Sequence, residues 1–317
     1  MLYLEILAGL ALLLVGGDAL VRGAVALAGV LGVSPFLIGI TIVGFGTSAP
    51  ELVTSLEAAL IGSPGIAVGN VVGSNIANVL LILGLTALLA PVAVSRQAFL
   101  RDGAMLLLAS LACLAVVLLG SLERLAGLLF IAVLLLYLLQ AYHRDRRAQR
   151  AAGCPQGAVA HPAPARRRLW LAAGLTLAGL ALTLVGAKLL VGGAVALASA
   201  AGVSQTLIGL TLVAVGTSLP ELSTSVVAAL RRQGDVALGN VVGSNIFNVL
   251  AILGITAVVR PVPVPAEIVE LDVWVMLTAT LALAVFAVSG WRLCRAEGAV
   301  LLAGYCAYLG VLAATSL

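Results

Sequence analysis

Long apolar stretches, separated by short polar or glycine- and proline-containing breaks, run through almost the whole chain. A helix needs about 20 apolar residues to cross the hydrocarbon of a bilayer. Stretches of that length lie near residues 2–21, 34–61, 66–89, 103–121, 125–142, 169–197, 204–230, 236–259, 272–289 and 298–316. The pattern predicts an all-α integral membrane protein with ten transmembrane helices.

One long polar stretch, residues 143–168, lies between the fifth and sixth predicted helices. It has arginine runs at both ends and three prolines between them, which favours a flexible basic linker. We therefore expect a first five-helix repeat over residues 1–142 and a second over 169–317. Because five is odd, the second repeat must enter the membrane upside down, so the halves are predicted to form an inverted repeat.

The two halves also share a segment of sequence. Residues 32–91 and 202–261 align without a gap at an offset of 170 (217 − 47 = 170 for the threonines), and about 37 of 60 positions are identical. The repeated blocks are polar: GTSAPE aligns with GTSLPE, and GNVVGSNIAN aligns with GNVVGSNIFN. Packing alone seldom fixes such residues in an apolar sequence, so we expect a doubled polar site.

Composition agrees with a membrane protein, since 62% of residues are hydrophobic and only 9% are charged. Soluble domains are about one-quarter charged. The four cysteines have no CxxC spacing, and both histidines fall in the polar stretch, so neither a disulfide framework nor a zinc site is indicated. Residues 2–21 have no basic front and no small-residue cleavage site, and we expect a retained helix.

The arginines predict the orientation of the helices. If residues 143–168 are cytoplasmic, the same side holds Arg22, Arg96, Arg101, Arg231, Arg232, Arg292 and Arg295. The opposite side holds only Arg124 and Arg260. This positive-inside bias places both termini on the extracytoplasmic side.

Polar residues recur at helical spacing in the middle of four predicted spans. Pro50 and Pro220 each remove a backbone hydrogen bond, which bends the helix and loosens carbonyls such as those of Gly44 and Ala214. The side chains that share a face beside these bends are Thr47, Ser48 and Glu51, Ser74 and Asn78, and their repeat partners Thr217, Ser218, Glu221, Ser244 and Asn248. All are hard oxygen ligands, which Ca²⁺ takes and Na⁺ also accepts.

The two glutamates are costly without a cation. A charge at the bilayer centre costs roughly 2.5–3.5 kcal/mol on the gentlest scale, and two carboxylates about 5 Å apart repel by roughly 3 kcal/mol at a dielectric constant of 20. No arginine or lysine lies in either polar block. We hypothesise that the empty site cannot be occluded cheaply, so the protein changes sides only when loaded, as an exchanger does.

Several other polar residues have two interpretations. The asparagines at 70, 75, 240 and 245 fit interhelical hydrogen bonds as well as ion binding. Asp18 and Lys188 occupy equivalent positions with opposite charge, and they could pair or each extend toward the membrane surface. Glu57 has Val227 as its repeat partner, so we expect it near the surface.

The paired blocks GTSAPE (46–51) with GNVVGSNIAN (69–78), and GTSLPE (216–221) with GNVVGSNIFN (239–248), resemble the cation/Ca²⁺ exchanger superfamily, and most of all the prokaryotic sodium/calcium exchangers. The resemblance implies ten helices in two inverted halves and four ion sites between the second, third, seventh and eighth. It implies that Glu51 and Glu221 bind Ca²⁺ with the carbonyls of Thr47 and Thr217. The implied Na⁺ ligands are Ser48, Ser74, Ser218, Ser244 and the carbonyls of Gly44 and Ala214.

One position departs from the family. Well-known members carry an aspartate where this chain has Asn248, so both central positions, Asn78 and Asn248, are amides. Loss of that acid argues against potassium co-transport. The proton-coupled branch carries a glutamate just after its Gly-Asn pair, and this chain does not. Na⁺ is therefore the expected driving ion.

The sequence thus predicts a Na⁺/Ca²⁺ antiporter of a prokaryotic plasma (inner) membrane that works by alternating access. An exchanger of H⁺ for Ca²⁺ or another divalent cation is the alternative. An intramembrane hydrolase is disfavoured because no histidine, cysteine or metal triad accompanies the glutamates, and a cation channel is the third option. We expect Ca²⁺ and Na⁺ as substrates, the lipid bilayer as surroundings, and no cofactor, enzymatic activity, nucleic acid or obligatory protein partner.

Overall fold

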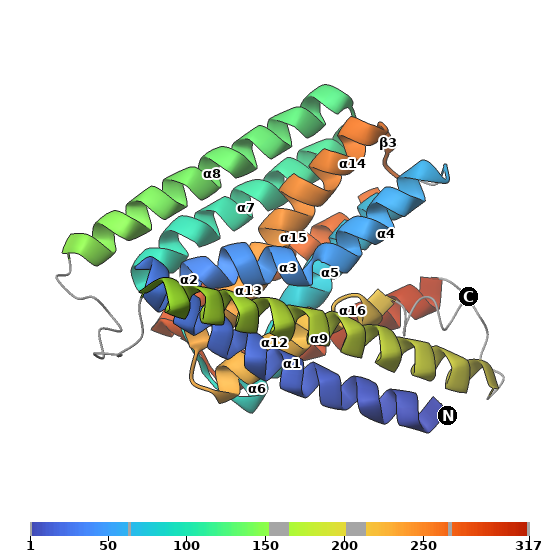
Figure 1. Ribbon diagram of the computed structural model, residues 1–317. Coiled ribbons are helices and arrows are strands. Elements are labelled where there is room, and N and C mark those ends of the chain that lie inside the picture. Colours follow the sequence, from blue (N-terminus) through green and yellow to red (C-terminus); the bar gives the residue numbers. More distant parts are fainter. Residues whose placement is uncertain (1, 63–64, 152–164, 201–213, 266–267, 316–317) are drawn as a thin grey trace.

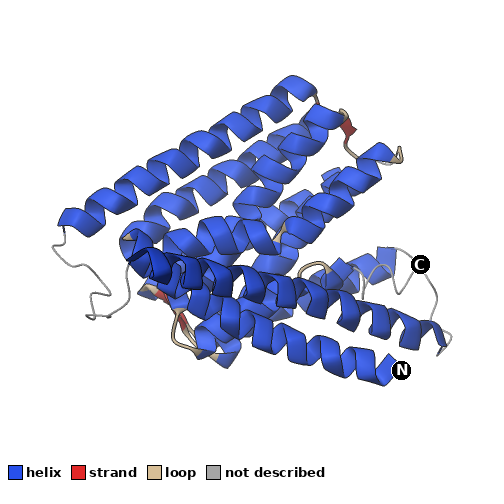
Figure 2. Cartoon of the chain, in the orientation of Figure 1, coloured by secondary structure: helices blue, strands red, loops and turns tan. Residues whose placement is uncertain are grey.

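A computed structural model describes residues 2–62, 65–151, 165–200, 214–265 and 268–315 of the chain. Helices make up nearly all of these residues, and the strands are only two residues long (Figure 2). The first half contains α1 (Leu2–Leu31), α2 (Pro35–Ile38), η1 (Gly39–Val43), α3 (Gly44–Thr47), α4 (Ala49–Leu60), α5 (Gly65–Ile76), η2 (Ala77–Leu83), α6 (Gly84–Leu89), β1 (Val92–Ala93), α7 (Arg96–Leu119), β2 (Ser121–Leu122) and α8 (Arg124–Ala151). The second half contains α9 (Ala165–Ala200), α11 (Ala214–Gly216), α12 (Leu219–Leu230), α13 (Gly234–Phe247), η4 (Asn248–Leu253), α14 (Gly254–Val259), β3 (Val262–Pro263), η5 (Ile268–Asp272), α15 (Val273–Gly290), β4 (Arg292–Leu293) and α16 (Arg295–Thr315).

Within the described residues, eight helical segments are long and apolar enough to cross a membrane. A further candidate is a bent pair, Pro35–Thr47 with Ala49–Leu60, whose two parts meet at 43°. The shorter apolar helix α12 falls in the predicted span 204–230, of which residues 204–213 lie outside the described part. The chain is a multi-pass helical membrane protein, and the count of ten helices stays a prediction.

The helices on either side of the predicted linker are longer than expected. α8 continues to Ala151 and α9 begins at Ala165, so both enter residues 143–168. The physical reason is that residues 143–151 contain neither glycine nor proline and are rich in helix-forming arginine, alanine and glutamine. Asp145 in this segment is buried, and it accepts hydrogen bonds from Ser34 N at 2.7 Å and Ser34 Oγ at 2.8 Å.

Two segments form the core. In the apolar 18-residue stretch that qualifies each span, 78% of residues are buried in Gly65–Leu89 and 89% in Gly234–Val259, against at most 39% in any other long span of the described residues. These are the segments that carry the repeated GNVVGSN blocks. The surrounding spans keep most of their apolar surface exposed, as helices that face lipid do.

The first helices of the two halves pack directly on each other. Gly9 of α1 lies against Gly186 and Leu190 of α9, and a Cβ atom built on Gly179 would lie 2.3 Å from Leu20 N. Residue numbers fall along α9 as they rise along α1, so the helices run antiparallel, and Figure 1 shows them side by side. Glycine permits this approach because no side chain separates the backbones.

Two short antiparallel ladders join the halves. β1 pairs with β4 through Val92 and Leu293, and β2 pairs with β3 through Ser121 and Pro263. Each ladder takes one strand from each half.

Candidate ion-binding site

The predicted bends place both glutamates at the start of a helix. Ser48 (φ −81°, ψ 7°) separates α3 from α4, and Ser218 (φ −89°, ψ 6°) separates α11 from α12 in the same conformation. Pro50 and Pro220 follow in the first turn, where a missing N–H costs nothing. The proline bend predicted in the second span is therefore confirmed, at 43°.

Each half supplies a serine to the glutamate of the other half. Ser48 Oγ donates to Glu221 Oε1 at 3.0 Å, and Ser218 Oγ donates to Glu51 Oε1 at 3.2 Å. Both carboxylates are 1% exposed, so they lie buried between the halves. The first turn of a helix favours a negative charge because unpaired N–H groups point toward it.

In each carboxylate, only one of the two oxygens accepts a hydrogen bond from a described residue. Among the described residues, the Oε2 atoms of Glu51 and Glu221 have no hydrogen-bond partner, and neither side chain has an ion pair. A buried carboxylate is tolerated only when it is paired, protonated or bound to a metal ion. The free oxygens therefore require a cation or proton.

Two buried asparagines show the same arrangement. Asn78 Nδ2 donates to Asn245 Oδ1 at 2.9 Å, and Asn248 Nδ2 donates to Asn75 Oδ1 at 3.0 Å. Within the described part of the chain, the Oδ1 atoms of Asn78 and Asn248 accept no hydrogen bond. These bonds fix the nitrogen end of each amide and leave its oxygen end free.

The backbone at these two asparagines is π-helical. Asn78 is the second residue of η2, and Asn248 is the first residue of η4. π-helical turns occur frequently at functional sites. This feature was missed at the sequence level, where no residue pattern signals it.

Other asparagines brace the helices. Asn70 Nδ2 donates to Glu51 O at 3.1 Å and Ser55 Oγ at 3.0 Å. Asn240 Nδ2 donates to Glu221 O at 3.2 Å and Ser225 Oγ at 2.9 Å. The interhelical interpretation of Asn70 and Asn240 fits these contacts.

The remaining predicted site residues lie around the glutamates. Ser244 Oγ lies 3.4 Å from Glu221 Oε1 and 3.3 Å from Gly44 O, and its repeat partner Ser74 is buried. Thr47 is fully buried, with its hydroxyl 3.2 Å from Asn240 Oδ1. Thr217 lines a cavity beside Pro50, whereas Ala214 opens α11 next to residues outside the described part.

The donor set is made of oxygen atoms alone. In the part of the chain that the structure describes, no three His, Cys, Asp or Glu side chains form a cluster that could hold a metal ion. The site instead offers two carboxylates, two amide oxygens and serine hydroxyls. This set suits a hard cation such as Ca²⁺ or Na⁺ better than zinc.

Comparison with known proteins agrees with this chemistry. The sodium/calcium exchanger protein family matches residues 1–142 and 171–314. The CaxA protein of Alkalimonas amylolytica is 41% identical over 96% of both chains, and the sodium/calcium exchanger MaX1 of Methanosarcina acetivorans is 34% identical over 98% of both. A structure of the sodium-calcium exchanger NCX_Mj superposes with a TM-score of 0.83, at 33% identity over 96% of both chains.

The match extends over both halves, and the relatives span the same length as this chain. The fold is that of NCX_Mj, and the buried oxygen site lies within the matched residues. The chain belongs to the sodium/calcium exchanger family.

Proposed function

We propose that the protein is a Na⁺/Ca²⁺ antiporter that binds its ions between the halves, with Glu51 and Glu221 as the central Ca²⁺ ligands. One observation carries the proposal: both buried glutamates keep an unpaired Oε2 atom while serines of the opposite half hold their Oε1 atoms. Such oxygens gain most from a divalent cation that both carboxylates share.

The other ligands follow from position. Amide, hydroxyl and carbonyl oxygens complete the Ca²⁺ and Na⁺ sites. They are the free Oδ1 atoms of Asn78 and Asn248, the hydroxyls of Ser48, Ser74, Ser218 and Ser244, and the carbonyls of Gly44, Thr47, Ala214 and Thr217. Two carboxylates give the site a charge of −2, which one Ca²⁺ balances. Since Ca²⁺ or Na⁺ must neutralise the glutamates before the site closes, transport in one direction depends on transport in the other.

We also propose an inverted repeat, with both termini extracytoplasmic and the segment 143–168 cytoplasmic. The antiparallel course of α1 and α9, which are equivalent at an offset of 170, supports the inversion. The arginine distribution supports the orientation. In this arrangement the protein moves Ca²⁺ outward as Na⁺ flows in.

Flux into proteoliposomes tests the proposal. Purified protein in Na⁺-loaded vesicles is diluted into Na⁺-free buffer with ⁴⁵Ca²⁺, and Na⁺, K⁺ and H⁺ gradients are imposed one at a time. We expect Ca²⁺ uptake only with an outward Na⁺ gradient. Uptake that follows pH and ignores Na⁺ would favour the H⁺/Ca²⁺ alternative, and ion current without a counter-ion would indicate a channel.

A further inference from the structure

The first helix of each half meets the other half in a different way. α1 packs closely on α12, where Ser223 Oγ donates to Leu13 O at 2.6 Å. Asp18 of α1 forms an ion pair with Arg231, the residue that follows α12, and another with Arg22 at 2.7 Å. This contact is closed, and a charge pair lies at its end.

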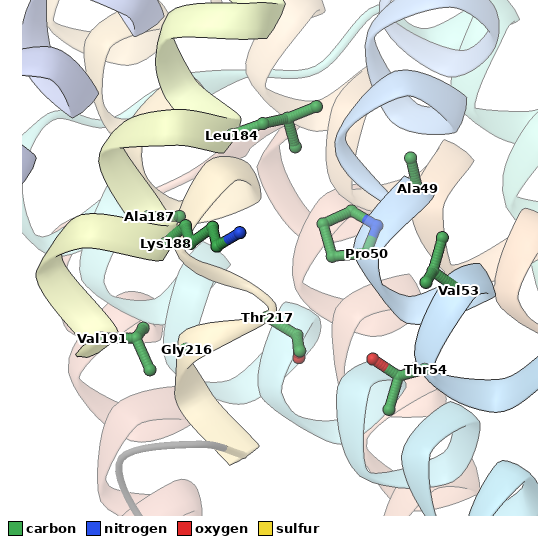
Figure 3. A pocket seen from close by; sticks show the side chains of 10 residues that line it. All are labelled: Ala49, Pro50, Val53, Thr54, Leu184, Ala187, Lys188, Val191, Gly216 and Thr217. Carbon is green, nitrogen blue, oxygen red and sulfur yellow. The ribbon is translucent and has the colours of Figure 1, made fainter. Parts of the chain in front are cut away.

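The equivalent contact in the other half is open. A cavity of about 540 Å³ separates α9 from α4 and reaches the loop beside the glutamates (Figure 3). Its walls are Ala49, Pro50, Val53 and Thr54 on one side, Leu184, Ala187, Lys188 and Val191 on the other, and Gly216 and Thr217 at the site. Thr217, next to Ser218 of the candidate site, is one of the residues that line this cavity.

Lys188 places a positive charge in this cavity. Its side chain extends across the cavity toward Pro50 (Figure 3) and is exposed. It has no ion pair among the described residues, unlike Asp18, which holds the equivalent position (188 − 18 = 170). An unpaired ammonium repels each cation that enters.

Glu57 lies on the same wall of α4, farther from the ion site. Pro50, Val53 and Thr54 line the cavity, and Glu57 follows at the next helical turn on that face. It is exposed, and within the described residues its carboxylate has no ion pair. The repeat position of Arg231 is Ile61, which cannot pair (231 − 170 = 61), so Glu57 is the acid available on this face.

We infer that Lys188 and Glu57 form the charge pair that closes this cavity when α9 packs on α4, as Asp18 and Arg231 close the opposite contact now. The inference rests on the alternating access of the proposed function. Seven residues separate Pro50 from Glu57, so α9 must shift along α4 by about 10 Å at the rise of an α-helix. In the closed state the pair neutralises both charges, and in the open state Lys188 extends unpaired into the cavity.

A charge swap tests this pair. Lys188→Glu and Glu57→Lys should each slow Na⁺-driven Ca²⁺ uptake about fivefold or more, because each puts like charges together in the closed state. The double variant should return to within about twofold of the wild-type rate, since the pair is restored with its signs exchanged. Lys188→Arg keeps the charge and should transport like the wild type.

A matched control uses the other charge near this end of α4. Arg260 Nη1 donates to Ala59 O at 3.1 Å, so Glu57→Lys combined with Arg260→Glu changes the same local charges without Lys188. The rate of Ca²⁺ uptake should not recover in this double variant. Three results would each overturn the inference. They are recovery of transport in the Glu57–Arg260 double variant, wild-type transport in both single variants, and a Lys188–Glu57 double variant as slow as the slower of its two single variants.

Cross-linking tests the pair without a measurement of transport. With the native cysteines replaced by serine, Lys188→Cys is combined with either Glu57→Cys or Pro50→Cys and treated with a short bifunctional thiol reagent. We expect both pairs to cross-link, because each pair is close in a different conformation. Added cations should change the fraction of the protein that forms the 57–188 product. If only the 50–188 product forms under every condition, the gate is wrong even where the exchange reaction is established.

Discussion

Each glutamate in the site has two oxygens with different surroundings. The Oε1 atoms of Glu51 and Glu221 accept from serines of the opposite half, and the Oε2 atoms have no partner among the described residues. In the proposed ion site, the serine bonds hold the carboxylates in place before an ion arrives. Binding then needs little rearrangement, because the side chains are already oriented.

Glu51→Gln and Glu221→Gln should abolish Ca²⁺ transport and leave the protein folded. Glutamine keeps the Oε1 acceptor for Ser218 or Ser48 and removes a buried charge, so stability should not fall. We expect Ca²⁺ affinity to drop by about tenfold to a hundredfold per site, as loss of a charged ligand implies. Calorimetric Ca²⁺ titration measures this change.

The exposed Glu123→Gln serves as the control and should bind and transport normally. Wild-type Ca²⁺ affinity in either buried variant would contradict the assignment of these glutamates as ligands.

Asn248→Asp should retain Ca²⁺ binding and change the dependence of transport on pH or on the driving cation. The aspartate raises the site charge from −2 to −3, so it admits one more proton or monovalent cation. In the wild type, Asn248 Nδ2 donates to Asn75 Oδ1 at 3.0 Å. An aspartate at position 248 has no N–H group, so the Asn75 amide must rotate to donate its own N–H to the carboxylate. Flux at several pH values, in Na⁺ and in K⁺, measures the effect.

The variant of the repeat partner, Asn78→Asp, should behave in the same way, because Asn78 Nδ2 donates to Asn245 Oδ1 as Asn248 Nδ2 donates to Asn75 Oδ1. Behaviour unchanged in both ion preference and pH response would count against Asn248 as a ligand.

The structure brings together several residues that the repeat signals, and their roles as ion ligands stay a prediction. The serines beside the glutamates could be named because Pro50 and Pro220 mark the break and helical spacing sets the face. The exchange of serines between halves could not be foreseen, because it depends on how α3 and α12 meet in space. Asp18 forms ion pairs with Arg22 and Arg231 and not with Lys188.

At the scale of elements, the contact of α1 with α9 is unusual for its closeness. Gly16 and Gly179 face each other, and a Cβ on Gly16 would lie 2.6 Å from Thr183 N. No flexible side chain lies between the backbones to absorb a change. The two helices are therefore expected to move together as one body, which couples the closed contact at α12 to the open one at α4.

Gly179→Val should destabilise the protein and slow exchange. The added side chain meets the backbone of Leu20, so α1 and α9 must separate, at a cost of about 1–3 kcal/mol for overpacking. Thermal unfolding in detergent, followed by size-exclusion chromatography, measures the loss.

Gly174→Val in the same helix is the control, because a Cβ there has no neighbour within 4 Å. Equal losses in the two variants would mean that valine harms α9 through helix propensity and not through its contact with α1.

Sequence patterns predicted most elements and missed some of their details. The apolar stretches located the long helices, but residues 143–151 were expected in a linker and instead continue α8. Arginine-rich sequence is read as polar, although it forms helix readily once Asp145 anchors it to Ser34. The π-helical turns at Asn78 and Asn248 depend on a shifted backbone hydrogen bond, which composition does not reveal.

At the scale of the whole molecule, several of the contacts at the centre cross between the halves. The ladders β1–β4 and β2–β3, the serine–glutamate bonds and the asparagine pairs each need both halves. The halves are therefore bound more by each other than by the segment that connects them.

Cutting the chain within residues 152–164 should leave the protein assembled and active. A protease site placed there and cleaved after purification should give two fragments that co-elute in detergent and still take up Ca²⁺ in vesicles. The same cut in the Gly179→Val variant should release the fragments more readily. Separation of the wild-type fragments would show that the covalent connection is needed.

The serine exchange between halves also bears on how the protein is made. The ribosome delivers residues 1–151 to the membrane before Ser218 and Glu221 are synthesised. During that interval Glu51 has no Ser218 to donate to it, and Ser48 has no Glu221 to accept its hydrogen bond. The newly inserted first half must wait as an incomplete intermediate, protected by insertion machinery or by a protonated carboxyl, until its counterpart is synthesised.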